Sequence, residues 1–463
     1  MKLPKQKWSQ THLQVSNDIR GSTIQLKLTT LLELYPQELD KITKAITIAS
    51  QHHKSRHIWK KIVGDNRPGL DSRFMCILHF PYTSRTTPKN MSSQHQTPIL
   101  RVGIIGCGEI TQVAHIPNLN FLSHRYQTTY LCDISQQALE HCARKVQGGT
   151  PKTTADAAEL CSSPDVDVVV IANADAYHVE HGLLALKNDK YTLIEKPASV
   201  CFRDLDLLVE AEKKSKGKVM VGTMRRFATA FTDAVKEVGG MEKIQYARVR
   251  DIIGPNSTFV DQSGTFPLKF SDYSDADTKD RLKREADISE QALAKEFGVP
   301  VTPGSQLMLR LLGGLGTHDL SAMREIIGMP KSVAGACLTF PGIFSVLFKY
   351  DDFPVTYESG FSKVPQFDAH IEVYSPEKIV RVDFDTPYVK GLPVTMTIRE
   401  LIGNDGFQER KVRKTYQDPY TNEFLELYDC VVNGRAPKTS ALDARNDIEL
   451  FKMILRADSS RYQ

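Results

Sequence analysis

The sequence has none of the features that place a protein in a membrane, on a secretory route or among disulfide-linked or zinc-binding folds. No apolar run approaches the roughly 18 residues of a membrane helix, and the first segment, MKLPKQKWSQTHLQ, lacks the apolar stretch of a secretory signal. The eight cysteines include no Cys-x-x-Cys pair, so we expect no disulfide framework and no metal. With 463 residues, 41% hydrophobic and 25% charged, the chain is typical of a soluble, cytoplasmic protein of two or three domains.

Positive charge is concentrated in the first part of the chain. Residues 1–95 contain 15 Lys and Arg against 6 Asp and Glu, whereas residues 96–463 contain 44 against 49. These basic residues are dispersed, without a dense run or interleaved aromatic residues, so we expect no nucleic-acid partner. We interpret residues 1–95 as a basic, poorly ordered extension that precedes the organised part of the chain.

The organised part begins with a pattern of strand, glycine turn and helix. In ILRVGIIGCGEITQVAHIPNL, an apolar run leads directly into Gly106-x-Gly108-x-x-Thr111. A dinucleotide needs a tight turn at the first glycine, close approach of its pyrophosphate at the second, and a helix amino terminus that holds negative charge. Thr111 departs from the usual third glycine, and a purely structural turn is the alternative. The residues predicted here to bind a cofactor are Gly106, Gly108, Glu109, Ile110 and Thr111.

An acidic residue ends the next apolar run, YQTTYLCDIS. A carboxylate at the end of the second strand, here Asp133, would accept hydrogen bonds from the adenosine ribose and repel a 2′-phosphate. The cofactor is therefore NAD or NADP, and Asp133 favours NAD. It lies 25 residues after Gly108, somewhat beyond the usual spacing of about 20.

Strand and helix patterns alternate through the following segment. Apolar runs at residues 166–172 and 191–194 flank a helical pattern over residues 177–187, which predicts a doubly wound parallel sheet. Ligands of such sheets bind at the carboxyl ends of the strands. The residues expected there, and predicted to contact the cofactor, are Asn173, His178, Glu195 and Lys196.

Four segments together carry a family resemblance: GIIGCGEITQVAHIPNL, NADAYH, EKPAS and VGTMRRF. In this combination, residues 98–460 resemble the Gfo/Idh/MocA family of nicotinamide-dependent oxidoreductases, which includes glucose-fructose oxidoreductase and inositol dehydrogenase relatives. The resemblance implies a Rossmann domain over residues 98–226. It further implies an α/β domain over residues 227–463, with a large, mostly antiparallel sheet, that binds substrate and forms a homodimer or homotetramer. Strand-like runs recur through this second region, as the resemblance leads one to expect, at residues 244–253, 332–339, 343–349, 355–361, 370–374, 379–383 and 393–398.

The resemblance also implies that Lys196 and His318 are catalytic. Oxidation of a secondary alcohol requires removal of the hydroxyl proton, and a histidine with an ordinary pKa of roughly 6.5 suits that task. Lys196 would orient the same oxygen. The family's aspartate four residues before the histidine is replaced by Gly314, and a capping or packed histidine is the alternative for His318. The residues predicted to contact substrate are Arg226, Arg310 and His318.

These observations predict an NAD(P)-dependent dehydrogenase or reductase. It would transfer hydride between nicotinamide and a hydroxyl or carbonyl group of a sugar, cyclitol or similar small molecule. A non-catalytic dinucleotide-binding sensor of the same fold is the alternative, and Gly314 is the residue that favours it. A charged insertion follows the first strand of the second domain, and we expect a helix over residues 278–297 and a lid over the substrate.

Overall fold

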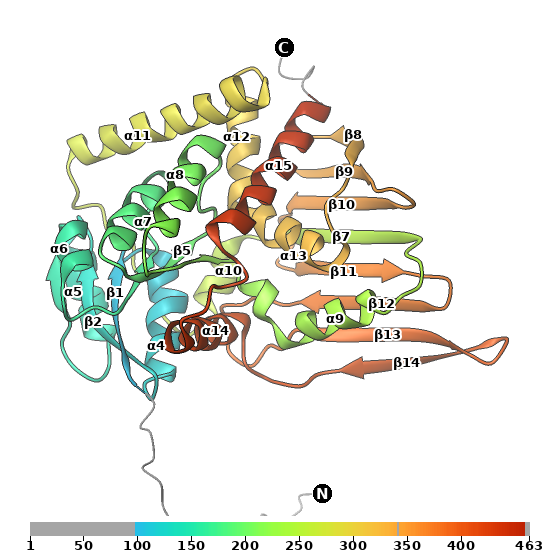
Figure 1. Ribbon diagram of the computed structural model, residues 1–463, viewed down its shortest axis with the longest axis horizontal. Helices are drawn as coiled ribbons and strands as arrows, with labels where there is room; N and C mark the ends of the chain where they lie inside the picture. The colour runs from blue at the N-terminus through green and yellow to red at the C-terminus, as the bar shows by residue number, and fades with distance from the viewer. Residues whose placement is uncertain (1–97, 340–341, 459–463) are drawn as a thin grey trace, which may run out of the picture. The chain divides into compact units, whose positions relative to one another are not determined.

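The computed structural model describes residues 98–339 and 342–458, so the extension predicted for residues 1–95 lies outside the described part of the chain. Two β-sheets organise the described residues, one of six strands and one of eight. Figure 1 shows the six-stranded sheet among its helices on the left and the eight-stranded sheet on the right. No helix of the described residues is long and apolar enough to cross a membrane.

The six-stranded sheet is parallel throughout, with strand order β3-β2-β1-β4-β5-β6. The chain enters at the centre and winds outward in both directions, which is the order of a dinucleotide-binding Rossmann fold. The predicted doubly wound sheet is confirmed. Its strands are β1 (Leu100–Ile105), β2 (Tyr126–Cys132), β3 (Lys152–Thr154), β4 (Val168–Ile171), β5 (Tyr191–Glu195) and β6 (Val219–Gly222).

Helices cover both faces of this sheet because its central strands are apolar on both sides. Alternate side chains of β4 show the division, since Val169 and Ile171 pack in one core and Val168 and Val170 in another. The first face is covered by α6 (Ala157–Ser162), α7 (His178–Lys187) and α8 (Phe202–Lys213), and the second by α4 (Ile116–Phe121), α5 (Gln136–Lys145) and α14 (Pro419–Asn433). Helix α14 thus returns from the end of the chain to the first sheet.

The eight-stranded sheet has the order β14-β13-β12-β11-β7-β10-β9-β8 and is antiparallel except where β7 and β10 pair in parallel. The predicted large, mostly antiparallel sheet is therefore confirmed. Its strands are β7 (Tyr246–Ile253), β8 (Ser332–Cys337), β9 (Ile343–Lys349), β10 (Pro354–Phe361), β11 (Phe367–Tyr374), β12 (Lys378–Phe384), β13 (Thr395–Ile402) and β14 (Gly406–Val412).

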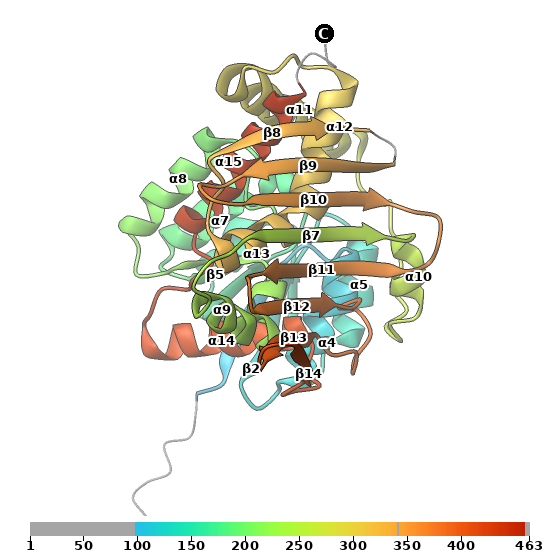
Figure 2. The ribbon, with the colours of Figure 1, turned by 90° about the vertical axis from the view of Figure 1, so that its right-hand side faces the viewer.

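One face of this sheet packs on helices and the other is open. Residues of β9 alternate between exposed and buried, as expected of a sheet with a single covered face. Figure 2 shows the open face, on which no described helix lies. The helices on the inner face are α9 (Thr229–Gly239), α13 (Thr317–Ile327) and α15 (Ala441–Ala457).

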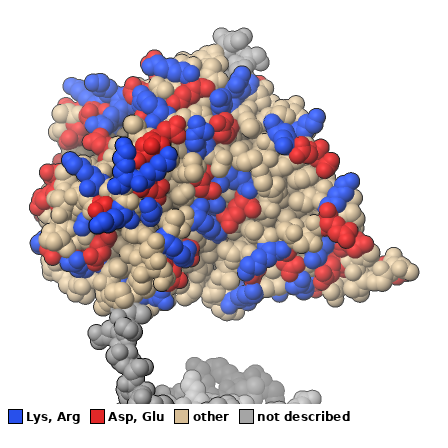
Figure 3. Space-filling view, viewed as in Figure 1, with Lys and Arg blue, Asp and Glu red and all other residues tan. Residues whose placement is uncertain are grey.

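The insertion between β7 and β8 forms helices that extend over the Rossmann domain. Its longest helix begins with a capping box in which Ser274 and Asp277 exchange side-chain and backbone hydrogen bonds. This helix carries charges of both signs, which Figure 3 shows interspersed on the surface at the upper left. Salt bridges from Arg284 to Glu180 and from Arg203 to Asp287 join it to α7 and α8. The elements are α10 (Asn256–Asp261), α11 (Asp275–Glu290), η4 (Gln291–Phe297), α12 (Pro303–Leu311) and η5 (Leu312–Gly316).

Candidate functional site

The glycine turn after β1 has the shape that a dinucleotide requires. Gly106 has a φ of +98°, and a Cβ there would lie 2.5 Å from the backbone nitrogen of Asn173, so only glycine fits. A Cβ at Gly108 would meet no atom within 4 Å, which leaves its backbone open to a pyrophosphate. Thr111 donates a 2.6 Å hydrogen bond from its hydroxyl to the Gly106 carbonyl. The residue that departs from the glycine pattern therefore closes the turn.

Asp133 follows β2 and lies against the same turn. Its carboxylate accepts hydrogen bonds from the backbone nitrogens of Cys107, at 2.6 Å, and Ser135, at 2.8 Å. Burial raises the pKa of Asp133, and these two hydrogen bonds oppose that rise. Each oxygen keeps a further lone pair, so the carboxylate can still accept from the hydroxyls of a ribose. These positions suit the adenosine half of a nicotinamide dinucleotide.

The loops after β4 and β5 are tied together by buried side chains. His178 lies between two backbone carbonyls, with Nδ1 2.8 Å from Pro197 O and Nε2 3.1 Å from Asn173 O. It is only 2% exposed, so it supports these loops from beneath. The Asn173 amide nitrogen is 3.1 Å from His181 Nδ1, and burial lowers the pKa of His181 to about 4.

Glu195, at the end of β5, forms a buried pair that the sequence did not indicate. Its Oε1 lies 3.0 Å from Nε2 of His115, which is fully buried. Burial raises the pKa of Glu195, but the hydrogen bond and charge of His115 outweigh that effect and hold it below its ordinary value. Glu423 of α14 is also fully buried, and its own burial together with the charge of Glu195 raises its pKa well above the ordinary range. The shifts therefore favour the ionised form of Glu195 and the neutral form of Glu423.

Lys196 is the first residue after β5, and its side chain reaches the segment before α13. Its Nζ donates a 2.7 Å hydrogen bond to the carbonyl oxygen of Gly314. Desolvation lowers the pKa of Lys196, although the negative charge of Glu195 partly opposes it. The Lys196–Pro197 peptide bond is cis. Two of the three ammonium hydrogens remain available to a ligand.

His318 lies in the first turn of α13 and is 9% exposed. Its desolvation, with the nearby charges of Lys196 and Arg225, lowers the pKa of His318 well below 6.5. Its Nδ1 has no hydrogen-bond partner among the described residues. The imidazole is therefore neutral at physiological pH, so one of its two ring nitrogens carries no proton, and Nδ1 itself is buried.

Arg225 lies between two buried carboxylates close to this histidine. It comes from the short helix η3 (Met224–Phe227), contacts Asp319 of α13 directly, and lies 3.2 Å from Asp251 of β7. Burial and the charge of Asp251 raise the pKa of Asp319 well above its ordinary value, while the guanidinium opposes them. The three residues form a compact charged cluster beneath His318. The Asp319 carboxyl group is thus engaged by Arg225.

Comparison with known proteins agrees with this geometry. A family model described as an oxidoreductase family with an NAD-binding Rossmann fold matches residues 100–223. The myo-inositol 2-dehydrogenase of Thermotoga maritima is 25% identical over 356 residues, which are 75% of this chain and 92% of that protein. The NAD-binding region of the chain, residues 100–223, belongs to the Gfo/Idh/MocA oxidoreductases. The predicted family and the prediction of an oxidoreductase are therefore confirmed.

Other relatives of the chain match it in part or in fold. The inositol 2-dehydrogenase/D-chiro-inositol 3-dehydrogenase of Lactiplantibacillus plantarum is 31% identical over 153 residues, 32% of this chain and 41% of that protein. A levoglucosan dehydrogenase in complex with NADH and levoglucosan has a TM-score of 0.59 at 14% identity, covering 79% of this chain and 98% of the other. An oxidoreductase from Thermotoga maritima has a TM-score of 0.56 at 20% identity, covering 78% and 97%. At these identities the structural likeness concerns the fold.

The two arginines of the MRRF segment have different surroundings. Arg226, predicted to contact substrate, is 4% exposed and forms salt bridges with Glu325 and Asp443. Both carboxylates pair with the Arg226 guanidinium. The position of Arg226 therefore gives the prediction of a substrate contact no support. The arginine whose charge reaches both Lys196 and His318 is its neighbour, Arg225. The sequence places two consecutive arginines, Arg225 and Arg226, after β6. It did not indicate which of them lies near Lys196 and His318.

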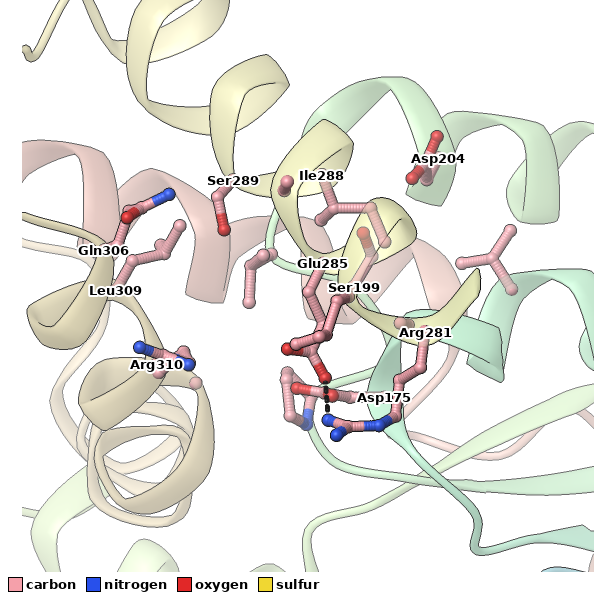
Figure 4. A pocket seen from close by; sticks show the side chains of 17 residues that line it. Asp175, Ser199, Asp204, Arg281, Glu285, Ile288, Ser289, Gln306, Leu309 and Arg310 are labelled. Atoms are coloured by element: carbon pink, nitrogen blue, oxygen red, sulfur yellow. Dashed lines mark hydrogen bonds and ion pairs between the residues drawn. The ribbon is translucent and has the colours of Figure 1, made fainter. Parts of the chain in front are cut away.

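A cavity of about 300 Å³ adjoins the lysine loop, bounded by α11, α12 and the residues after β5. Figure 4 shows Arg310 on one side of it and Asp175 on the other, near an ion pair of Arg281 with Glu285. Its walls also include Pro197, Ser199 and Gly313, which are neighbours of Lys196 and Gly314. The predicted substrate residue Arg310 therefore lines this cavity, whereas Lys196 and His318 are not among its lining residues. The insertion predicted as a lid borders the same cavity.

Proposed function

We propose that the chain is an NAD-dependent dehydrogenase that oxidises a secondary CH–OH group of a cyclitol, sugar or similar polyol, or reduces the corresponding ketone. The observation that carries the proposal is the pairing of a tethered lysine, Lys196, with a neutral histidine, His318, whose pKa is lowered by burial and by the nearby charges of Lys196 and Arg225. The proposed catalytic residues are these two. The names of the relatives from Thermotoga maritima and Lactiplantibacillus plantarum support a cyclitol or sugar substrate.

The glycine turn and Asp133 are proposed to hold NAD, with the Rossmann region at residues 98–226 and the substrate region at residues 227–463. When bound, the nicotinamide ring supplies the acceptor or donor of hydride. Asp133 supports NAD over NADP, because a carboxylate at this position accepts from a ribose 2′-hydroxyl and repels a phosphate. Glu109 and Ile110 are proposed to lie along the pyrophosphate with Gly108.

The chain's own residues perform the proton chemistry. Lys196 donates a hydrogen bond to the substrate oxygen through a hydrogen not used by Gly314, and it stabilises the negative charge that develops there. His318 accepts the hydroxyl proton on the ring nitrogen that carries no proton and returns it in the reverse direction. Arg225 acts as a positioning residue, because its charge helps to keep His318 neutral.

The cavity supports a polar substrate. Carboxylate, guanidinium and hydroxyl groups line it beside Pro197, and they offer both donors and acceptors to several hydroxyl groups. We propose Arg310 as one of these contacts. A homodimer or homotetramer is proposed to form through the open face of the eight-stranded sheet, where Ile343 and Leu347 are exposed.

The second candidate function is a non-catalytic dinucleotide sensor. Gly314 favours it, because the position that carries an aspartate in the family has no side chain here. Against it, a binding protein has no physical need for a lysine and an unpartnered histidine at the same place.

One experiment separates the two functions. The full chain is titrated with NADH by nicotinamide fluorescence, and single-turnover oxidation of bound NADH is followed with a panel of inososes and ketoses. Lys196→Ala and His318→Ala are compared with wild type, and Lys187→Ala, an exposed lysine at the end of α7, is the control. The dehydrogenase proposal expects NADH binding in all variants and turnover lost only in the first two. NADH binding without turnover of any carbonyl would establish the sensor.

A further inference from the structure

Part of the insertion, residues 265–272, lies on the Rossmann domain close to Asp133. The side chain of Gln112 exchanges two hydrogen bonds with the Leu268 backbone, accepting at 2.8 Å and donating at 2.9 Å. Lys145, in the last turn of α5, donates to the carbonyl oxygens of Thr265 and Phe266. These contacts extend from the helix after the glycine turn to the far end of α5. The segment therefore runs along the adenosine side of the proposed cofactor site.

Asp272 ends this segment at the amino terminus of α5. Its carboxylate accepts hydrogen bonds from the hydroxyl of Ser135 and, at 3.1 Å, from the backbone nitrogen of Gln137. The backbone nitrogen of Ser135 donates to Asp133. One serine thus joins two carboxylates that are 139 residues apart in the sequence. The two hydrogen bonds lower the pKa of Asp272, which is ionised at neutral pH.

In this arrangement Asp272 accepts the hydrogen bonds that a 2′-phosphate of NADP would otherwise accept at the start of α5. If Asp133 accepts from the ribose 2′-hydroxyl, a phosphate on that hydroxyl would lie beside Ser135 and the start of α5. Asp272 already uses the Ser135 hydroxyl and the Gln137 N–H at that helix terminus. Residues 133–137, DISQQ, contain no lysine or arginine that could offset a phosphate charge.

We propose that Asp272 is a specificity-determining residue that excludes the 2′-phosphate of NADP and so selects NAD. The inference rests on the proposed dinucleotide-binding function. It goes beyond that function because the selecting carboxylate comes from the insertion rather than from the Rossmann domain. The anchors at Gln112 and Lys145 hold the segment in place, and the negative charge of Asp272 is favourable at a helix amino terminus.

The test measures binding, so it does not depend on turnover. NADH and NADPH are titrated against wild type, Asp272→Asn and Asp272→Lys by nicotinamide fluorescence. AMP and adenosine 2′,5′-bisphosphate are titrated by calorimetry as probes of the adenosine half alone. Asp275→Asn is the matched control, because it removes the same charge from an exposed position three residues further along the insertion.

Wild type is expected to bind NADH more tightly than NADPH. Because Asp272 is exposed and solvent screens its charge, Asp272→Asn should strengthen NADPH and bisphosphate binding by about five- to tenfold, with NADH changed less than about twofold. Asp272→Lys should strengthen them further, and Asp275→Asn should change neither.

Four results would overturn the inference. Unchanged NADPH affinity in both Asp272 variants, or an equal change for NADH and NADPH, would remove the selective role while leaving the proposed function intact. A wild type that prefers NADPH would contradict it directly. Absence of binding of either dinucleotide to wild type would overturn the proposed function and the inference with it.

Discussion

Lys196 donates a hydrogen bond of 2.7 Å to the backbone oxygen of Gly314, the residue that stands where the family carries an aspartate. A carbonyl oxygen carries only partial charge, so it holds the lysine in place without stabilising its positive charge as a carboxylate would. Desolvation consequently keeps the pKa of Lys196 below its ordinary value. The relationship leads to the first prediction.

Gly314→Asp is expected to raise the pKa of Lys196, because a carboxylate would then lie close to its ammonium group. A Cβ at Gly314 would meet no atom within 4 Å, so the variant should fold. The limb of the pH–rate profile that depends on protonated Lys196 should move to higher pH by about one unit. Gly314→Asn has the same shape without the charge and should leave the limb unchanged. Equal shifts in both variants would contradict an electrostatic cause.

Arg225→Gln is expected to destabilise the fold by about 3–5 kcal/mol, because it leaves the buried carboxylate of Asp251 without its cation and removes the contact with Asp319. Urea unfolding measures the loss. Arg445→Gln, which removes an arginine from a half-exposed pair with Asp206, is the control and should cost less than about 1 kcal/mol. Asp319→Asn should also cost little at neutral pH, since the raised pKa of Asp319 favours its neutral form. Similar stability of all three variants would show that the cluster carries no net charge interaction.

The lowered pKa of His318 predicts a dependence of stability on pH. In the unfolded chain this histidine takes up a proton near pH 6.5, whereas in the folded protein it stays neutral at that pH. Its contribution is therefore fully present above pH 6.5 and is lost as the pH falls toward the folded pKa. Between pH 6.5 and 5, wild type should lose stability more steeply than His318→Gln, by up to about 1.4 kcal/mol per pH unit. Parallel curves from urea unfolding would show that His318 keeps an ordinary pKa.

Substitution of the two glycines of the turn should have different effects, on cofactor binding at Gly108 and on stability at Gly106. Gly108→Val should retain the stability of wild type, because space surrounds the position, but should weaken NADH binding at least about tenfold by filling the pyrophosphate space. Gly106→Ala should instead lower the thermal midpoint, since its Cβ would clash with the backbone of Asn173 at a φ of +98°. Thermal unfolding and fluorescence titration distinguish these outcomes. Unchanged NADH affinity in Gly108→Val would place the cofactor elsewhere.

The pattern of apolar residues was sufficient to predict most strands, since β9 matches its predicted run at residues 343–349 and β7 differs by two residues. Strand β14 was not predicted. Its residues, GFQERKV, are almost all exposed at the edge of the sheet, so it has no buried face to produce an apolar alternation. Its pairing with β13 is a long-range backbone interaction that no local pattern reports.

The sequence by itself determined the parallel sheet, the glycine turn and the position of Asp133 after the second strand, and the family resemblance singled out Lys196 and His318 as candidates. These features depend on local spacing and on alternating burial, which a chain expresses residue by residue. Only the tertiary structure decided that Arg225 rather than Arg226 lies near enough to His318 to lower its pKa, and that Asp272 lies beside Ser135. Each of these two arrangements depends on which carboxylate or hydroxyl group, distant in the sequence, a side chain contacts after folding. Spacing along the sequence does not specify such contacts.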